Sequence, residues 1–473
     1  MKRIRRALGI LLLAAVPVGC APSHYEEATL ALLNVDVIAL QNEVVLEDHM
    51  VVLSGNRIVA VEPTDVRRLP PDTRQVQGNG AYVLPGLTDM HVHAMSSTED
   101  ALERAFPLLV ANGITTVRDM GSELAILTEV RARLRLEPGR AAPRVLAAGP
   151  LLDGVRKPWY RDLPLILETP AVVAEELPGL REAGVDFFKV YDDLDPATYD
   201  AIAAAANDSA LPFAGHVPDG VSIEHAVEVG QRTIEHLGLA TVKDCVDDPG
   251  GWFEKAIHAR FRQGYDAYYR VLIDHWESLD WSRCEAVLTA LGQPGVYFTP
   301  TLDMEINDRS RIDPSTIRYM APGSQTWCNQ VLEQIDAAEP TLRKRAYEHQ
   351  FDAFRRIHEA GARILVGTDA PNNCVLEGFS LHGELALLVE AGLSPGEALR
   401  AATFHAARAL GRGELAGLVE AGREADLVLL DENPLEEIGN TRSVVGVVLR
   451  GSWLDRAALD ALLVDALSAV RQP

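Results

Sequence analysis

Hydrophobic residues in the middle of the chain fall into short runs rich in β-branched and aromatic residues, separated by Ala- and Leu-rich stretches of helical character. Eight of these runs are predicted strands: LTDMHVH, GITTVRDM, RVLAAGP, DFFKVYDD, LPFAGHV, RTIEHLG, VYFTPTL and RILVGTDA. Alternating strands and helices are typical of parallel β/α architecture, and eight is the number of strands that closes a parallel barrel. The pattern therefore predicts an α/β fold with a (β/α)8 TIM-like barrel over residues 85–410.

Both ends of the chain show a different pattern, with short apolar runs broken by Gly and Asn. These runs are TLALLNVDVIAL, DHMVVLSGNRIVAV and QGNGAYVLPG near the start, and EADLVLLD and VVGVVLRGSWL near the end. They read as β-strands. We expect residues 28–84 and 411–473 to pair into one small β-sandwich domain beside the barrel. The length of 473 residues exceeds a single core and accommodates both parts.

Residues 240–295 form a stretch that is long for a single connection between a strand and a helix. The stretch is also rich in Trp, Tyr and Phe. Long ordered connections tend to be functional. We therefore predict a helical insertion over the mouth of the barrel.

The first twenty residues resemble an export signal. Basic residues at positions 2–6 precede an apolar stretch at 8–18 that is too short to span a bilayer. Cys20 directly follows Gly19, which predicts a lipoprotein-type signal over residues 1–20 with a lipid on Cys20. Pro17 stands where such signals usually carry Leu, so ordinary cleavage nearby, giving a soluble periplasmic protein, stays open.

The formal net charge of −24 argues against nucleic acid as a partner, because phosphate binding needs clustered Lys and Arg. The expected partner is a small-molecule substrate. Contact with a membrane is expected only through a lipid on Cys20. The sequence leaves the oligomeric state open.

Histidines at the end of the first predicted strand are the first sign of chemistry. His91 and His93 are two residues apart, so their side chains share one face of a strand. In a barrel that face is the interior, and both imidazoles can reach a single ion at the mouth. Taken alone the pair is weak evidence, since two polar residues at a strand end are common.

Further candidates end later strands. Lys189 lies in the apolar fourth strand, where an inward charge is costly unless it is removed or paired. Carbamylation would remove it, and an ion pair with a nearby acid is the alternative. His216, His236 and Asp369 end the fifth, sixth and eighth strands. Strand ends of this kind converge on one mouth. The conjunction therefore predicts a metal centre, with zinc favoured and manganese, iron or cobalt possible.

The surrounding residues are less decisive. Tyr191 faces the same way as Lys189, so it either binds a substrate carboxylate or carbonyl or packs in the barrel. Four residues after the third strand can supply a cation for an acidic substrate group or be ordinary loop residues: Arg156, Lys157, Trp159 and Tyr160. His382 is expected to be structural, holding the loop that follows Asp369.

Several motifs together resemble the amidohydrolase superfamily, in the branch of imidazolonepropionase-like proteins and metal-dependent Xaa-Pro dipeptidases. They are VLPGLTDMHVH, FFKVYDDL, FAGHVPDGV, TIEHL and VGTDAP, followed by SLHGELALLVEAGLSPGEALRAATFHAARALG and GLVEAGREADLVLLDENPLEEI. The similarity covers residues 28–460. These motifs are specific for the superfamily and poor at naming a substrate.

The resemblance implies a role for each matching position. His91, His93 and Asp369 would hold one divalent ion, and His216 and His236 a second. Carbamylated Lys189 would bridge them, and a hydroxide between the ions would attack the substrate. Asp369 would shuttle the proton to the leaving nitrogen. The implied function is an exported binuclear hydrolase of amide-like C–N bonds, with a dipeptide or N-acyl amino acid as the favoured substrate.

Two alternatives remain. One is a mononuclear deaminase or imidazolone or lactone hydrolase of the same fold, against which Lys189 argues because such enzymes do not need that lysine. The other is a non-catalytic binding lipoprotein, against which the complete set of candidate ligands argues.

Four cysteines remain after Cys20, and their positions in a barrel predict two disulfides. Cys245 and Cys284 flank the long insertion, while Cys328 and Cys374 follow the adjacent seventh and eighth strands. We therefore predict the bridges Cys245–Cys284 and Cys328–Cys374, with four buried thiols as the alternative.

Overall fold

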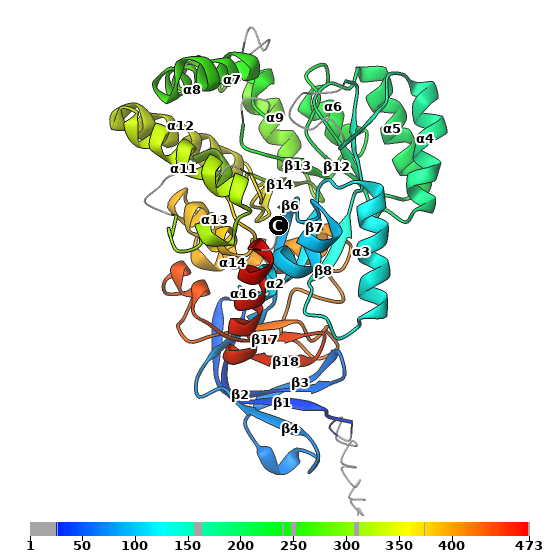
Figure 1. Ribbon diagram of the computed structural model, residues 1–473, viewed down its shortest axis with the longest axis vertical. Helices are drawn as coiled ribbons and strands as arrows, with labels where there is room; N and C mark the ends of the chain where they lie inside the picture. The colour runs from blue at the N-terminus through cyan, green and yellow to red at the C-terminus, as the bar shows by residue number, and fades with distance from the viewer. Residues whose placement is uncertain are drawn as a thin grey trace, which may run out of the picture.

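The computed structural model describes Tyr25 and residues 27–155, 163–238, 241–246, 252–306, 312–372 and 374–471. A β-domain lies at one end of the molecule, the barrel in the middle and a group of helices at the opposite end (Figure 1). Some of the sequence predictions lie outside the described residues: the signal with Cys20, and the loop residues Arg156, Lys157, Trp159 and Tyr160.

All eight predicted barrel strands are present. They are β6 (Leu87–Val92), β7 (Ile114–Asp119), β8 (Arg144–Ala147), β11 (Phe188–Val190), β12 (Phe213–Gly215), β13 (Thr233–Glu235), β14 (Tyr297–Thr299) and β15 (Arg363–Ile364). Neighbouring strands pair in parallel, as in β6–β7 and in the run from β11 to β15. The prediction of an α/β barrel with an additional domain is confirmed.

The barrel closes through short segments that the sequence pattern did not predict. After β8 the chain turns at Gly149, at φ +70°, and continues as β9 (Leu151–Asp153), which pairs with β11 and with β10 (Pro164–Ile166). The third strand therefore contacts β7 with its first half and β11 with its second. On the other side, Met90 N donates to Val366 O at 2.8 Å and Asp369 N donates to His91 O at 2.7 Å. These hydrogen bonds join the segment that follows β15 to β6.

Helices alternate with the strands around the outside of the barrel (Figure 1). They are α1 (Thr98–Asp100), a π-helix (Ala101–Ala105), α2 (Phe106–Ala111), α3 (Leu124–Leu136), α4 (Pro170–Glu182), α5 (Pro196–Ser209), α6 (Ile223–Glu228), α10 (Leu302–Ile306), α11 (Pro322–Ala337), α12 (Pro340–Glu359), α13 (Phe379–Glu390), α14 (Pro395–Ala401) and α15 (Phe404–Ala409). The start of α14 shows clear capping chemistry: Ser394 and Glu397 form a capping box, and Pro395 begins the helix. Within the described residues, no helix combines the length and apolar character needed to cross a bilayer.

The predicted insertion is helical. It contains η3 (Lys243–Cys245), α7 (Trp252–Gln263), α8 (Tyr265–Ser278) and α9 (Cys284–Leu291). The helix α8 packs against α12, at the end of the molecule far from the β-domain (Figure 1). Both predicted disulfides are confirmed, with Cα–Cα distances of 4.8 Å for Cys245–Cys284 and 5.0 Å for Cys328–Cys374. The first bridge closes the base of the insertion.

Strands from both ends of the chain form the β-domain. They are β1 (Leu30–Ala39), β2 (Val44–Ser54), β3 (Arg57–Pro63), β4 (Arg74–Gln77), β5 (Tyr82–Pro85), β16 (Leu427–Leu430), β17 (Val444–Leu449) and β18 (Ser452–Asp455). They are hydrogen-bonded in one continuous sheet, in which β5 pairs with β16 and so joins the two ends. The sheet buries apolar residues on both faces, with Leu32 on one side and Leu33 on the other. The domain boundaries at 84/85 and 410/411 stay a proposal.

The remaining turns of helix complete the outline. They are η1 (Val66–Arg68), η5 (Ile317–Tyr319) and η6 (Ile438–Arg442), and the described chain ends with α16 (Arg456–Val470). This last helix packs against α2, so the end of the chain lies on the barrel.

Candidate metal centre

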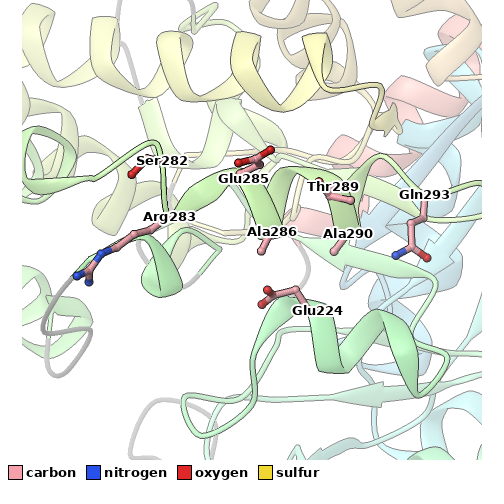
Figure 2. A pocket seen from close by; sticks show the side chains of 8 residues that line it. All are labelled: Glu224, Ser282, Arg283, Glu285, Ala286, Thr289, Ala290 and Gln293. Carbon is pink, nitrogen blue, oxygen red and sulfur yellow. The ribbon is translucent and has the colours of Figure 1, made fainter.

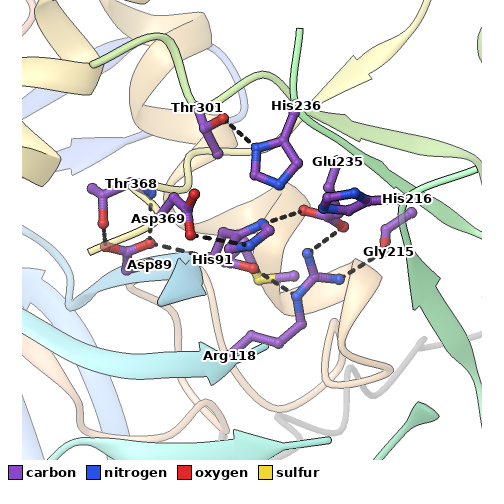
Figure 3. Close-up of polar contacts among 12 residues, drawn as sticks. Asp89, His91, Arg118, Gly215, His216, Glu235, His236, Thr301, Thr368 and Asp369 are labelled. Carbon is purple, nitrogen blue, oxygen red and sulfur yellow. Dashed lines mark hydrogen bonds and ion pairs between the residues drawn. The ribbon is translucent and has the colours of Figure 1, made fainter. Parts of the chain in front are cut away.

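The six residues predicted as metal ligands meet at one end of the barrel. His91 lies in β6, Lys189 in β11, and His216 and His236 directly follow β12 and β13. Figure 3 shows the imidazoles of His91, His216 and His236 turned toward one another, with Asp369 beside them. Because parallel strands point their carboxyl ends the same way, residues far apart in sequence share this mouth.

The first half of the cluster contains two histidines and one carboxylate. Oδ1 of Asp369 lies 3.5 Å from His91 Nε2 and 3.3 Å from His93 Nε2. One ligand atom from each of the three residues lies within 4.8 Å of the others. The other oxygen of Asp369 accepts a hydrogen bond from Asn372 Nδ2 at 3.0 Å, which fixes the carboxylate. This group can hold a divalent cation.

The second half continues directly from the first. The ring centroids of His91 and His236 are 4.6 Å apart, and those of His236 and His216 are 4.7 Å apart with the rings nearly perpendicular. The four imidazoles therefore form one continuous group rather than two separate sites.

A hydrogen-bond partner behind the ring occupies Nδ1 of each histidine. His91 contacts Glu235 Oε2 at 3.0 Å, His216 contacts Asp192 Oδ1 at 2.6 Å, and His93 contacts Gly121 O at 3.2 Å. Carboxylate and carbonyl oxygens only accept, so Nδ1 of these three rings carries a proton, and in a neutral ring the lone pair is then on Nε2. Burial would lower the pKa of His93, but the hydrogen bond with Asp369, whose carboxylate its Nε2 faces, raises it. Nδ1 of His236 contacts Thr301 Oγ1 at 2.8 Å. Outer partners of this kind orient histidine ligands in metal sites. The donor set therefore fits a divalent cation.

The charges at the site agree with that fit. Burial would raise the pKa of Asp369, but His91 and the hydrogen bond with His93 outweigh it and hold the pKa well below its usual range. Burial lowers the pKa of His236 to about 3 and also lowers that of His216. At neutral pH these two imidazoles are neutral and the carboxylate is ionised, which are the forms that bind metal.

Lys189 is inward and buried, as predicted, with 1% of its surface exposed. Burial lowers the pKa of its amine to about 8, so a substantial fraction is neutral near physiological pH. A neutral amine is the form that reacts with carbon dioxide. Among the described residues the Nζ atom forms no hydrogen bond, and the ring of Tyr191 lies 5.8 Å away.

The backbone is strained at two of these residues. His236 adopts φ 67° and Asp369 adopts φ 62°, and Thr301, the partner of His236, adopts φ 49°. Non-glycine residues rarely occupy this left-handed region, and such strain clusters at functional sites.

The ring of Tyr191 lies 4.1 Å from that of His216 at an angle of 31°, so it borders the second half of the cluster. Its contact with substrate stays a prediction. His382 is buried, its Nδ1 contacts Thr441 Oγ1 of η6 at 3.0 Å, and burial lowers its pKa to about 3. Its hydrogen bond goes to η6 and not to the loop after Asp369, so the expected anchoring of that loop is wrong, and its structural role stays a prediction.

Sequence reasoning missed the residues behind the histidines. Glu235 and Asp192 are adjacent or close to predicted ligands in TIEHL and KVYDDL. Arg118 is a charged residue inside an apolar strand, in TTVRDM. A buried charge in a short strand was the available signal, because such a charge needs a partner.

Two other concavities lie away from the cluster. One, of about 510 Å³, lies between α6 and α9 and is bordered by Glu224, Arg283 and Gln293 (Figure 2). The other, of about 500 Å³, is bordered by Trp252, Lys255 and other residues of α7 and α8. None of the six candidate ligands borders either of them.

Known proteins resemble the chain over most of its length. A model of the amidohydrolase family matches residues 82–454. The protein therefore belongs to the amidohydrolase family, as the motifs indicated.

Individual relatives differ in their activities. An adenine deaminase from Serratia proteamaculans (strain 568) is 28% identical over 80% of this chain and 49% of its own length. The chain thus spans about half the length of that relative. An imidazolonepropionase from Ectopseudomonas mendocina (strain ymp) is 27% identical over 85% of this chain and 91% of its own. The solved structure of a bottromycin amidohydrolase is 25% identical, covers 93% of this chain and 90% of its own, and superposes with a TM-score of 0.73.

Proposed function

We propose that this protein is a metal-dependent hydrolase that cleaves an amide-like C–N bond of a small molecule. One observation carries the proposal: four imidazoles meet beside the Asp369 carboxylate, each with its Nδ1 tied to a partner behind the ring. Histidines prepared in this way are suited to coordination through Nε2. Membership of the amidohydrolase family supports the same chemistry.

The proposed centre holds two divalent ions. His91, His93 and Asp369 would bind the first, for which their ligand atoms are already grouped. His216 and His236 would bind the second. Lys189, carbamylated, would bridge the two, and its buried position and lowered pKa support that assignment. Zinc is the proposed metal, because imidazole and carboxylate together suit it.

When bound, divalent ions lower the pKa of a coordinated water and polarise a carbonyl. The chain supplies the remaining steps. Asp369 is ionised, so it can accept the proton of the attacking water and return it to the leaving nitrogen. Asn372 holds the carboxylate in place for this transfer. Tyr191, beside His216, is proposed to hydrogen-bond a carboxylate or carbonyl of the substrate.

The favoured substrates are dipeptides and N-acyl amino acids, and a mononuclear deaminase or imidazolone or lactone hydrolase is the second candidate. The adenine deaminase and imidazolonepropionase relatives favour that second reading. Lys189 favours the first, because a single-ion site does not need a bridging lysine. A binding protein without activity is the remaining alternative, and the complete ligand set argues against it.

The test combines metal content with a substrate panel. Protein purified without chelator is expected to contain two equivalents of metal by elemental analysis. It is then offered dipeptides, N-acyl amino acids, lactones, adenine and an imidazolone, with release of amine or ammonia as the readout. One equivalent at full activity would replace the two-ion site by a single-ion one. A lack of turnover on every substrate, with metal bound, would favour the binding protein.

We also propose that the protein is exported. The disulfides Cys245–Cys284 and Cys328–Cys374 support this, because such bridges persist in oxidising compartments. Cell fractionation, with the mass of the N-terminal peptide, distinguishes a lipid-bearing Cys20, an ordinary cleavage product and a retained signal.

A further inference from the structure

We propose that Glu235 and Arg118 form a buried positioning pair that holds His91 in the form able to bind metal. The inference rests on the proposed two-ion site and adds residues that act through a ligand. Both side chains lie in the barrel interior, with exposed fractions of 0% for Glu235 and 4% for Arg118. Figure 3 shows the carboxylate of Glu235 between the guanidinium of Arg118 and the ring of His91.

The carboxylate uses its two oxygens for two different partners. Oε1 accepts from Arg118 Nη2 at 2.7 Å, and Oε2 accepts from His91 Nδ1 at 3.0 Å. A purely structural ion pair has no need of the second contact. Because a carboxylate oxygen only accepts, this contact keeps the proton on Nδ1 and leaves the lone pair on Nε2.

Arg118 supplies the opposite charge and the hydrogen bonds that offset the burial of the Glu235 carboxylate in the barrel interior. Its Nη1 donates to Thr233 Oγ1 at 2.7 Å and its Nε donates to Met90 O at 2.6 Å. The guanidinium therefore connects β7 to β13 and to the residue that precedes His91. An isolated buried carboxylate is costly, whereas one paired and fully hydrogen-bonded is tolerated. Arg118 thus lets His91 have an anionic partner without a net buried charge.

Other bonds fix the main chain of His91, so the ring is the part that Glu235 controls. His91 N donates to Asp89 Oδ1 at 3.1 Å, and its carbonyl accepts from Asp369 N at 2.7 Å. Neither bond sets which ring nitrogen carries the proton. The ring has a carboxylate on each side: Glu235 Oε2 lies 3.0 Å from Nδ1 and Asp369 Oδ1 lies 3.5 Å from Nε2, so the shorter contact favours the proton on Nδ1.

The Glu235–Arg118 pair acts on only one half of the proposed metal site. Glu235 supports a ligand of the first proposed ion, although it directly precedes His236, a ligand of the second. His216 has its own anionic partner in Asp192, at 2.6 Å. Each proposed ion therefore depends on one carboxylate behind one histidine. Removing either carboxylate is expected to weaken one ion only.

The variant Glu235→Gln tests the pair with almost no change of shape. Arg118 can only donate, so the amide oxygen is expected to face it and the amide NH2 to face His91. Nδ1 of His91 must then accept, which puts its proton on Nε2 where the metal binds. We expect affinity for the first ion to fall about 10–100-fold, while the second ion stays. Dialysis of the holoenzyme against graded chelator, followed by elemental analysis and the visible spectrum of the cobalt form, measures this.

Four further variants locate the lost ion and test the role of Arg118. His93→Ala added to Glu235→Gln is expected to remove no more metal, whereas His236→Ala added to it is expected to remove the remainder. Asp192→Ala removes the oxygen that accepts from His216 Nδ1, so it is the matched control and is expected to weaken binding of the other ion. The double variant Arg118→Met/Glu235→Gln frees the amide to turn its oxygen toward His91, so it is expected to regain part of the lost affinity.

The outcomes separate this inference from the proposed function. A Glu235→Gln protein that keeps both ions with the chelator profile of the unchanged protein overturns the positioning pair. So does equal loss of both ions. If the unchanged protein holds only one ion, the two-ion site fails, and the effect of Glu235→Gln on that ion still decides the role of the pair.

Discussion

Gly215 lies directly against Lys189 and Val190: a β-carbon at residue 215 would clash with the backbone oxygen of Val190 and stand 2.8 Å from Cδ and 3.1 Å from Cε of the lysine. Gly215 also has φ +130°, which residues with side chains rarely adopt. The glycine at the end of β12 therefore leaves the space that the inward lysine fills. The position of Lys189 in the site therefore depends on Gly215, a residue with no side chain to take part in the chemistry.

The variant Gly215→Ala is expected to displace Lys189 and to weaken metal binding by at least about tenfold, as supporting residues of metal sites do. Thermal stability of the metal-free protein should fall as well, because the strained φ costs about 1–3 kcal/mol. Gly139→Ala is the control, since a β-carbon there meets nothing within 4 Å. Equal chelator profiles for the two variants would contradict the dependence on Gly215.

Replacing Lys189 by Ala tests the bridge between the ions. We expect the metal content to fall below two equivalents and turnover to drop at least about 100-fold. Replacing residues that only support metal ligands lowers metal affinity or activity by up to about 100-fold, and a bridging residue should matter at least as much. Short carboxylic acids such as formate should restore part of both, because they can take the place of a carbamate. Lys344→Ala, at an exposed lysine, is the control and should change nothing. Unchanged activity in Lys189→Ala would refute the bridge.

Asp369→Asn tests the proton shuttle. With saturating metal, turnover is expected to fall about 10²–10⁴-fold while KM changes little, because general acid–base help is lost and substrate binding is not. Asn372→Ala removes only the hydrogen bond that holds the carboxylate and should have a smaller effect. If Asp369→Asn keeps near-normal turnover with full metal content, another group is the base.

His275 predicts a pH dependence of stability that is independent of the metal centre. Burial in α8 lowers its pKa to about 4, and neither ring nitrogen has a hydrogen-bond partner within the described part of the chain. In the unfolded chain the imidazole becomes protonated below about pH 6.5, whereas in the folded protein it stays neutral until the pH approaches its lowered pKa. Stability from this group is therefore complete above pH 6.5 and is lost as pH falls toward 4, by about 3 kcal/mol in all.

The variant His275→Leu should lose less of its free energy of unfolding between pH 7.5 and pH 4.5 than the unchanged protein does. Urea unfolding at both pH values measures the difference. His258→Leu, at an exposed histidine of α7, is the control and should keep the original dependence. Parallel pH profiles for His275→Leu and the unchanged protein would show that His275 ionises freely in the fold.

The sequence was sufficient for the eight barrel strands and for the meeting of the six candidate ligands at one end of the barrel, because both depend on local patterns. A candidate ligand such as His236 follows its own strand directly, and the barrel geometry then brings the strand ends together. That these residues bind metal stays a proposal. The strand β9 was missed because Gly149 and Pro150 end the predicted run RVLAAGP, and Leu151–Asp153 is too short to be recognised as a strand of its own. The length of an apolar run does not show where its pairing partner changes.

The network behind the ligands could not be predicted in the same way. Arg118 and Glu235 are far apart in sequence and meet across the barrel interior, so no spacing of residues along the sequence predicts their contact. His382 was expected to hold the loop after Asp369, but its partner Thr441 lies in a segment beyond the barrel. Partners of this kind depend on the complete fold rather than on any one element.

The pairing of β5 with β16 sets the order in which the molecule can be completed. A nascent chain makes Tyr82–Pro85 first and must then finish the whole barrel before Leu427–Leu430 arrives to pair with it. Until then one edge of β5 is uncovered, and uncovered edges recruit other strands. Termination before residue 427 would leave that edge open permanently. Only a chain that extends through residue 430 can therefore cover the open edge of β5.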